Sequence, residues 1–337
     1  MRRLPIFLVL DVSESMAGAS LDELNRGVAM LQQALLSDPM AMETVYLSVI
    51  AFAGKAKVVT PLTYILDFQP PRLSIGAGTS LTAALDCLMH EIDTQVKRNT
   101  PESKGDWRPL VFILTDGAPN DRYQAAVKRW KDRFPKVAVQ GVLMGEHSDA
   151  TALSQLTGSV TVFKEASPEA FRAFFKWVSS SVQMSSARVG AEGRQTGAEE
   201  LERLRDNLDA DLLATEMPTV NRVDYLVLPV RCQNTGRPYI VRFCKRKRTY
   251  EYDGIFMVDE GYFELSAEGG SDKSVSIEDV ACDLDDCPYC GNPMLGHCRC
   301  GKWLCLNPEH MDYVKCPWCG EYGDYGGNVD SLNGGLG

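Results

Sequence analysis

The sequence predicts an α/β protein whose main domain is a doubly wound, mostly parallel β-sheet with helices on both faces. Two observations support this fold class. Short apolar runs alternate with segments of helical spacing through residues 1–184, and polar motifs lie at the ends of apolar runs. Such alternation is typical of parallel sheets covered on both sides. The remaining chain has short β patterns and then closely spaced cysteines, which predict a small β-rich segment and a zinc module.

The strands and helices of the first domain can be placed in order. Continuous apolar runs are expected for strands that are covered on both faces. The predicted strands lie at residues 5–11, 43–53, 109–116, 137–145 and 160–164, with a short edge strand at 56–62 that Pro61 ends. Between and after them, apolar residues recur at helical spacing. These helical segments lie at residues 21–36, 81–96, 121–134, 150–156 and 168–182.

Three polar motifs lie beyond the ends of predicted strands. Asp11, Ser13 and Ser15 form D-x-S-x-S after the first strand, Thr79 lies in GAGTSL, and Asp116 lies in VFILTDG. Ligand-binding residues of doubly wound sheets gather at the carboxyl ends of the strands. Mg²⁺ prefers octahedral oxygen ligands and retains several waters, so three hydroxyls and two carboxylates suit it. The motifs therefore predict a Mg²⁺ or Mn²⁺ site that a partner's carboxylate can complete.

The combination of these motifs resembles the metal-ion-dependent adhesion site (MIDAS) of von Willebrand factor A (vWA) domains. The resemblance covers residues 1–184 and implies a Rossmann-like vWA sheet. It also implies that the domain binds a protein that presents an Asp or Glu to the metal.

No catalytic motif accompanies the predicted metal site. Ser13 lies in DVSES and not in the G-x-S-x-G of a nucleophile elbow. The sequence contains no Walker A motif, and no G-x-G-x-x-G follows the first strand. A metal-dependent hydrolase or phosphatase is the alternative, but it would need a general base beside the metal or a two-metal carboxylate cluster. The protein is therefore expected not to be an enzyme.

Two segments of different character follow the first domain. Residues 185–218 are polar and glycine-bearing, then charged, and predict a linker with a possible helix at 198–213. Residues 219–282 predict a β-rich segment, with strands in VDYLVLPVRC, PYIVRFCKR, DGIFMV and GYFEL. The basic run KRKR at 245–248 is interpreted as a solvated strand end, with contact to an acidic partner or a phosphate as the alternative.

Cysteines dominate residues 283–320. Two C-P-aromatic-C-G knuckles bracket three further cysteines and two histidines. A C-x-x-C turn lets two thiolates reach one tetrahedral zinc ion, and a segment this poor in apolar residues needs metal to fold. The predicted ligands are seven cysteines and one histidine, enough for two closed sites: Cys287, Cys290, Cys298, Cys300, Cys305, His310, Cys316 and Cys319.

The pairing of these ligands has two alternatives. A cross-braced arrangement gives Cys287, Cys290, Cys305 and His310 to one ion, and Cys298, Cys300, Cys316 and Cys319 to the other. A zinc ribbon would instead join the two outer knuckles. Residues 321–337 are rich in glycine and predict a flexible tail.

A vWA domain followed by a seven-Cys, one-His module resembles the TerY family of bacterial tellurite-resistance proteins. The family implies a cytoplasmic scaffold that is encoded with a protein kinase and a PP2C-type phosphatase in stress-response clusters.

Composition narrows the function further. The 337 residues carry a formal net charge of −10, which disfavours generic nucleic-acid binding, although binding through the zinc module remains an alternative. No apolar run approaches the ~20 residues that span a bilayer. Eleven cysteines, several in C-x-x-C pairs, indicate metal thiolates in a reducing cytoplasm rather than disulfides. The expected function is a non-catalytic, metal-dependent protein-binding scaffold.

Overall fold

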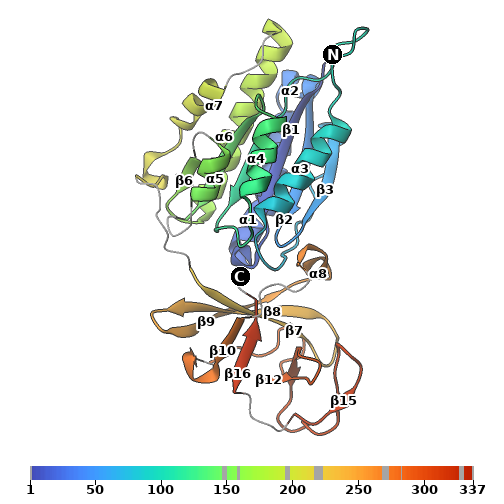
Figure 1. Ribbon diagram of the computed structural model, residues 1–337, viewed down its shortest axis with the longest axis vertical. Helices are drawn as coiled ribbons and strands as arrows, with labels where there is room; N and C mark the ends of the chain where they lie inside the picture. Colours follow the sequence, from blue (N-terminus) through green and yellow to red (C-terminus); the bar gives the residue numbers. More distant parts are fainter. Residues whose placement is uncertain are drawn as a thin grey trace. The chain divides into compact units, whose positions relative to one another are not determined.

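The computed structural model describes residues 2–145, 150–157, 160–193, 198–215, 223–267, 273–281, 283–325 and 330–335. The chain divides into two compact units, coloured blue to yellow and yellow to red along the sequence in Figure 1. The α/β unit comprises Met1–Leu73 and Thr79–Arg222, and the cysteine-rich unit comprises Ser74–Gly78 and Val223–Gly337. Among the described helices, none combines the length and the apolar character that crossing a membrane requires.

A six-stranded sheet forms the centre of the α/β unit. Its strands are β1 (Leu4–Asp11), β2 (Val45–Phe52), β3 (Ala56–Tyr64), β4 (Leu110–Thr115), β5 (Ala138–Met144) and β6 (Val160–Phe163). Their order is β3-β2-β1-β4-β5-β6, and only the edge strand β3 runs antiparallel to its neighbour. The predicted doubly wound, mostly parallel sheet is confirmed. The strand order reverses between β1 and β4, which places the ligand-binding crevice of such folds at their carboxyl ends.

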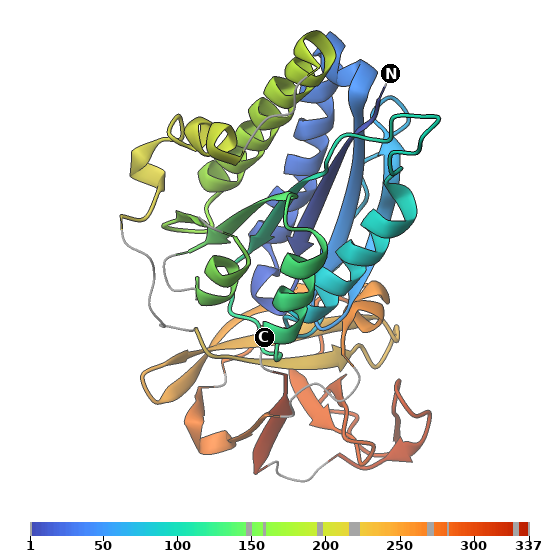
Figure 2. The same ribbon diagram turned by 45° about the horizontal axis from the view of Figure 1, so that its top comes forward.

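Helices cover both faces of this sheet (Figures 1 and 2). They are α1 (Ala19–Leu36), α2 (Pro39–Thr44), α3 (Leu81–Gln95), α4 (Gln124–Arg133), α5 (Thr151–Leu156) and α6 (Pro168–Ala187). Residues of α3, α4 and α5 share a core with Phe7, Val9 and Ile113 of the sheet. On the other face α1 and α2 pack against α6. Both faces are therefore buried, as the continuous apolar strands predict.

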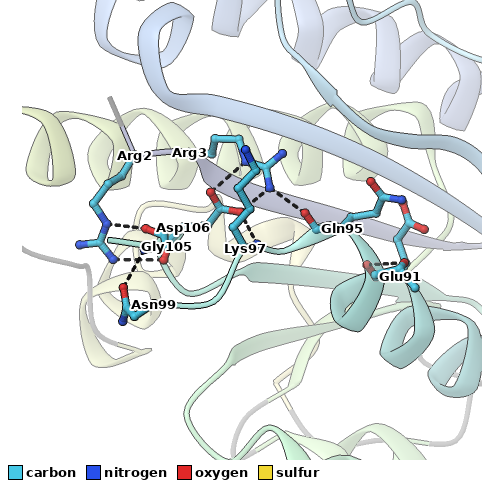
Figure 3. Close-up of polar contacts among 9 residues, drawn as sticks. Arg2, Arg3, Glu91, Gln95, Lys97, Asn99, Gly105 and Asp106 are labelled. Atoms are coloured by element: carbon cyan, nitrogen blue, oxygen red, sulfur yellow. Dashed lines mark hydrogen bonds and ion pairs between the residues drawn. The ribbon is translucent and has the colours of Figure 1, made fainter. Parts of the chain in front are cut away.

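The N-terminal end of β1 is fixed to the loop that precedes β4 (Figure 3). Arg3 donates hydrogen bonds from Nε and Nη2 to the two carboxylate oxygens of Asp106, at 2.8 and 2.5 Å. The Asp106 side chain is only 4% exposed and also accepts from the backbone N–H of Lys97 at 2.7 Å. Arg2 donates to the carbonyl oxygen of Gly105 at 2.7 Å. These contacts hold the first strand of the sheet at the end opposite to the predicted metal site.

Much of the segment predicted as a linker belongs to the α/β unit. Helix α6 continues into a π-helical turn (Arg188–Glu192), and α7 (Ala198–Arg205) follows with Leu201 completely buried. A 3-10 turn (Ala210–Leu212) then leads to Ala214, whose N–H donates to the carbonyl of Val162 in β6 at 2.9 Å. The linker prediction is thus corrected for the described residues before 198, and the possible helix at 198–213 is present over Ala198–Arg205. Apolar side chains and the open edge of β6 bind this segment to the domain.

A second six-stranded sheet organises the cysteine-rich unit. Its strands are β7 (Tyr225–Arg231), β8 (Pro238–Arg246), β9 (Thr249–Met257), β11 (Val280–Ala281), β12 (Met294–His297) and β13 (Trp303–Leu306), in the order β11-β9-β8-β7-β13-β12. Strand β13, from the predicted zinc module, pairs with β7, from the predicted β-rich segment. The two segments therefore form one unit and share a hydrophobic cluster that includes Leu228 and Trp303, and the boundary predicted at residue 282 divides a continuous sheet.

Smaller elements complete this unit. They are α8 (Gly261–Leu265), β10 (Lys273–Ser276), a 3-10 turn (Ile277–Asp279), β14 (Val314–Lys315), β15 (Tyr322–Gly323) and β16 (Ser331–Gly334). The sequence GYFEL, expected to be a strand, forms α8. The Asp259 carboxylate accepts the N–H of Gly261 at 2.9 Å, a side-chain turn that precedes the helix and competes with extended backbone.

Residues 330–335 also have defined pairing partners. Strand β16 pairs antiparallel with β10, and Val227 and Gly335 exchange backbone hydrogen bonds of 3.2 and 2.8 Å. Leu332 is 5% exposed, and Trp303 donates from Nε1 to the carbonyl of Asn333 at 3.2 Å. The prediction of a flexible tail is therefore wrong for residues 330–335, since pairing with distant strands provides the contacts that glycine-rich sequence lacks locally.

Candidate metal centres

The predicted magnesium ligands lie where the strand order of the α/β unit reverses. Strand β1 ends at Asp11, and the 3-10 turn that follows it (Glu14–Met16) contains Ser15. Strand β4 ends at Thr115, one residue before Asp116. Because β1 and β4 are parallel neighbours, the two motifs meet at one edge of the sheet.

Hydrogen bonds join these side chains into one network. The Ser13 and Ser15 hydroxyl oxygens are 3.0 Å apart, and Ser15 Oγ donates to Asp116 Oδ1 at 2.7 Å. The carboxylate of Asp11 accepts from the N–H of Ser13 at 2.8 Å and from the hydroxyl of Thr115. Four of the five predicted ligands are thus connected by direct contacts within or between the two strand ends.

Thr79 reaches the same edge from the loop before α3. Its backbone N–H donates to the Asn120 side chain at 3.2 Å, and its carbonyl accepts from the Asn120 N–H at 2.9 Å. Thr79, Thr115 and Gly117 line one small cavity of about 10 Å³. Asn120, which sequence reasoning missed, therefore positions Thr79 beside the loop that follows β4. The two-point contact is non-local, and no spacing in the sequence signals it.

The electrostatics of Asp11 favour a bound cation. The side chain is completely buried, and this burial raises its pKa to about 6 although hydrogen bonds from Ser13 and Thr115 favour the charged form. A buried carboxylate is costly without a compensating positive charge. The donor set of two carboxylates and three hydroxyls is all oxygen, as Mg²⁺ prefers. These residues therefore fit the predicted ion. Asp11 would bind it in its deprotonated form.

Eight cysteines of the other unit lie in two groups of four. Within each group the four sulfur atoms lie within 4.8 Å of one another. Sulfur cluster 1 contains Cys232, Cys287, Cys290 and Cys305, and sulfur cluster 2 contains Cys298, Cys300, Cys316 and Cys319. Two cysteine clusters of four can each bind a zinc ion.

The distances between sulfur atoms test this fit. They are 3.6 Å for Cys290–Cys305, 3.8 Å for Cys298–Cys319 and 3.9 Å for Cys300–Cys316. A Zn–S bond of about 2.3 Å in a tetrahedral site separates its sulfurs by about 3.8 Å. A disulfide requires about 2.05 Å. The clusters therefore have the spacing of zinc tetrathiolates and not of disulfides.

Four tight turns of one backbone pattern hold seven of these thiols, and the eighth, Cys305, lies in β13. In each, the carbonyl of a cysteine accepts the N–H of a glycine at 2.8–2.9 Å, and the cysteine N–H donates to the carbonyl of the residue after that glycine. Each glycine has a φ between 71° and 81°, a conformation that side chains disfavour. The turns are Cys232 to Gly236, Cys287 to Gly291, Cys298 to Gly301 and Cys316 to Gly320.

Cys232 is the cluster residue that sequence reasoning missed. The predicted site 1 contained His310, but the structure places Cys232 beside Cys287, Cys290 and Cys305. A signal was available, because C-Q-N-T-G at 232–236 has the length and final glycine of the two C-P-aromatic-C-G knuckles. Thr235 stands where those knuckles carry their second cysteine. Burial disfavours the Cys232 thiolate, but hydrogen bonds from the hydroxyl and amide of Thr235 outweigh it and lower its pKa to about 7.

The composition of the clusters distinguishes between the two predicted arrangements of the ligands, the cross-brace and the zinc ribbon. The outer knuckles at Cys287 and Cys316 lie in different clusters, so the structure does not bring them together as a zinc ribbon would. Cluster 2 has the membership of the cross-braced alternative. The order of the ligands along the chain is interleaved, since Cys305 of cluster 1 lies between Cys300 and Cys316 of cluster 2.

Comparison with protein families identifies two domains in the chain. The model of the von Willebrand factor type A domain matches residues 6–177, and that of the TerY-C metal binding domain matches residues 222–336. The chain belongs to the von Willebrand factor type A family. Its second match makes it a TerY-type protein, in which a vWA domain precedes a metal-binding domain.

Solved structures similar to this TerY-type protein align with about half of it. Proximal thread matrix protein 1 from the mussel byssus is 18% identical over 52% of the chain and 47% of its own, with a TM-score of 0.39. A von Willebrand factor type A protein from Catenulispora acidiphila is 17% identical over 54% and 43%, with a TM-score of 0.42. A pilus adhesin from Lactobacillus rhamnosus GG is 14% identical over 54% and 31%, with a TM-score of 0.43. The chain thus spans less than half the length of each of these three structures. A comparison with curated proteins found no match.

The extent of the TerY-C domain agrees with the geometry of cluster 1. Its match begins at residue 222, before β7, and so includes Cys232 together with the cysteines of residues 283–320. The strands of the β-rich segment are therefore part of the metal-binding domain, to which they contribute one cysteine of the cluster and most of the sheet.

Proposed function

We propose that this TerY-type protein is a non-catalytic, metal-dependent scaffold that binds other proteins. The observation that carries the proposal is the network of Ser13, Ser15 and Asp116 at the point where the strand order reverses. This network brings neutral hydroxyl groups together with few negative charges. An ion bound there would therefore still accept a further negatively charged ligand.

The adhesion site would hold Mg²⁺ or Mn²⁺ through Ser13, Ser15 and Thr79, with Asp11 and Asp116 supplying negative charge. When bound, the ion offers an electron-poor centre to a carboxylate of a partner protein. The chain's own residues orient the site. Thr115 and the Ser13 amide hold the Asp11 carboxylate in place, and Ser15 links the two strand ends. The partner would therefore present an exposed Asp or Glu to this edge of the sheet.

The two sulfur clusters would hold structural zinc ions. Four thiolates complete a tetrahedral shell and leave no position for a reacting water. Such ions contribute folding free energy to the domain that contains them. On the family resemblance, we further propose a cytoplasmic protein whose partners are a co-encoded kinase and a PP2C-type phosphatase in the response to tellurite or other stress.

The test is capture of the purified kinase and phosphatase by the immobilised full chain in Mg²⁺. Asp11→Ala should reduce capture by about tenfold or more, because the site loses its buried charge. Asp86→Ala is the matched control, since Asp86 is an exposed carboxylate paired only with Arg129 in the described contacts. Substitution is preferable to chelation, which would also remove zinc.

Equal capture by wild type and Asp11→Ala would show that docking does not use the adhesion site. The competing hydrolase hypothesis has its own readout. Metal-dependent hydrolysis of p-nitrophenyl phosphate by this chain alone, lost in Ser13→Ala, would favour an enzyme over a scaffold.

A further inference from the structure

The cysteine-rich unit contains a polar pocket beside cluster 1. Its volume is about 400 Å³, and four carboxamide side chains contribute to its lining: Gln233, Asn234, Asn292 and Asn307. His310 also lines it. The histidine that the sequence suggested as a zinc ligand thus faces this pocket and not the sulfur atoms.

The metal cluster fixes one wall of this pocket. Gln233 follows Cys232 directly, and its N–H donates to Cys305 Sγ at 3.2 Å. Asn292 is 8% exposed, and its Nδ2 lies 3.5 Å from the same sulfur. Gln233 and Asn292 are therefore both attached to Cys305 of cluster 1, and such support of a binding residue favours precise recognition.

An exposed pair of tyrosines, Tyr313 and Tyr322, also lines the pocket. Tyr313 and Tyr322 are 81% and 60% exposed, and Tyr313 is the most exposed large hydrophobic side chain in the described part of the chain. Their ring centroids are 5.4 Å apart at an interplanar angle of 31°. The two rings offer a contiguous apolar surface to solvent, a feature that often marks an interaction site.

The backbone at Tyr313 is strained. Its φ is 61°, and Lys247 is the only other non-glycine residue with positive φ in the ranges that the structure describes. Bulky side chains rarely adopt this conformation. Strained residues persist where function selects them. A glycine would relieve the strain, so the presence of a tyrosine here indicates a role for its ring.

The charges and donors of the pocket indicate its ligand. Asp312 and Lys315 are its two oppositely charged residues, which disfavours phosphates and other highly charged ligands. Carboxamides both donate and accept hydrogen bonds, as an extended peptide backbone does. Two adjacent exposed tyrosine rings fit a proline or aromatic ring, as in the aromatic-lined grooves that recognise proline-rich segments.

We infer that this pocket binds a short, extended, uncharged segment of a partner protein, with a proline or aromatic ring laid on Tyr313 and Tyr322. The choice of a protein rests on the proposed scaffold function, whereas the site itself is separate from the adhesion site and needs no carboxylate. The chain would then hold two proteins by different chemistry.

The experiment selects ligands from a phage-displayed library of random heptapeptides on the immobilised, zinc-loaded full chain. The selected sequences, made as synthetic peptides, are then measured by calorimetry. We expect enrichment of a proline or aromatic residue between uncharged residues. Tyr322→Ala and Tyr313→Gly should each weaken binding about tenfold or more. Tyr313→Gly should also raise the melting temperature or leave it unchanged, since it relieves the strain, so lost binding cannot reflect unfolding.

Two controls make the result specific. Met257→Ala removes another exposed apolar side chain, 67% exposed in the same unit, and should not affect binding. Asp11→Ala should retain peptide binding, which separates this site from the adhesion site. The inference is overturned if no sequence is enriched, or if both tyrosine variants bind the peptides as wild type does. It is also overturned if oligothymidylate or an oligosaccharide binds instead, with the same dependence on the tyrosines.

Discussion

The hydroxyl of Ser15 donates a hydrogen bond of 2.7 Å to the carboxylate of Asp116, across 101 residues of chain. This contact joins the ends of two neighbouring strands directly, without a metal ion between them. Ser13 extends it, with its hydroxyl 3.0 Å from that of Ser15. Oxygen ligands that are already together lose less conformational freedom when they bind an ion. Replacement of a single hydroxyl of this network should therefore weaken metal binding at the proposed adhesion site.

Ser15→Ala should weaken Mn²⁺ binding by about tenfold or more. The substitution removes one oxygen ligand and the hydrogen bond to a charged group, each worth about 1–3 kcal/mol. Isothermal calorimetry on the full chain measures the change. Ser37→Ala, which removes an exposed hydroxyl bonded only to its own helix in the described contacts, is the control. An unchanged Mn²⁺ affinity in Ser15→Ala would exclude Ser15 as a ligand.

Metal analysis of protein purified without added zinc should give close to two zinc ions per chain. Cys232→Ser should reduce this number to about one, because cluster 1 loses a thiolate from its tetrahedral shell. His310→Ala should retain both ions. Cys244→Ser provides the matched control, since Cys244 lies outside both clusters. If His310→Ala loses an ion and Cys232→Ser does not, the first cluster is wrongly assigned.

Asp106→Ala should lower the free energy of unfolding of the α/β unit by about 3 kcal/mol. It leaves Arg3, whose side chain is only 19% exposed, without its carboxylate partner, and breaking such a buried pair is strongly destabilising. Asp86→Ala breaks the pair with Arg129, whose side chains are about half exposed, and should change stability by less than about 1 kcal/mol. Urea denaturation followed by circular dichroism compares the two. Similar effects would show that burial does not strengthen the Arg3 pair.

Ionisation of Asp224 should make the stability of the folded protein depend on pH under acidic conditions. Burial opposes its ionisation, but hydrogen bonds from Lys273 and Tyr250 outweigh burial and lower its pKa below the ordinary value of 3.8. A lowered pKa stabilises the folded state above pH 3.8, and this contribution is lost as the pH falls below that value. The melting temperature of Asp224→Asn should therefore lie below that of wild type at pH 7, and the difference should diminish as the pH falls below 3.8.

Replacement of the exposed Asp279 provides the comparison for this pH series. A difference between wild type and Asp224→Asn that stays constant from pH 7 to pH 3 would show that the carboxylate charge does not stabilise the fold.

The parts of the fold that follow local sequence rules could be predicted. The continuous apolar runs around Leu8 and Phe112 identified the parallel strands, and D-x-S-x-S marked a strand end that the fold places beside Asp116. The knuckle glycines Gly291 and Gly320 indicated metal-binding turns, since their positive φ is a local requirement.

The missed features depend on contacts between distant segments. Cys232 has no cysteine within its own turn, and only the pairing of β7 with β13 brings it to Cys305. Asn120 holds Thr79 through contacts 41 residues apart. Pairing of β16 with β10 orders residues 331–334, whose composition alone suggests disorder. Propensity and spacing contain no information about such partners.

The interleaved order of the cysteines has a consequence for biosynthesis. Gln233, next to Cys232, and Cys305 are 72 residues apart, so cluster 1 cannot be completed until translation has passed residue 305. Cluster 2 begins earlier than Cys305, at Cys298, but it cannot be completed until Cys319 has been synthesised. The nascent strands β7, β8 and β9 thus leave the ribosome with an unpaired thiolate and an open sheet edge at β7. Zinc would therefore be captured late in the synthesis of the domain, and a chain that ends before residue 305 has the complete thiol set of neither cluster.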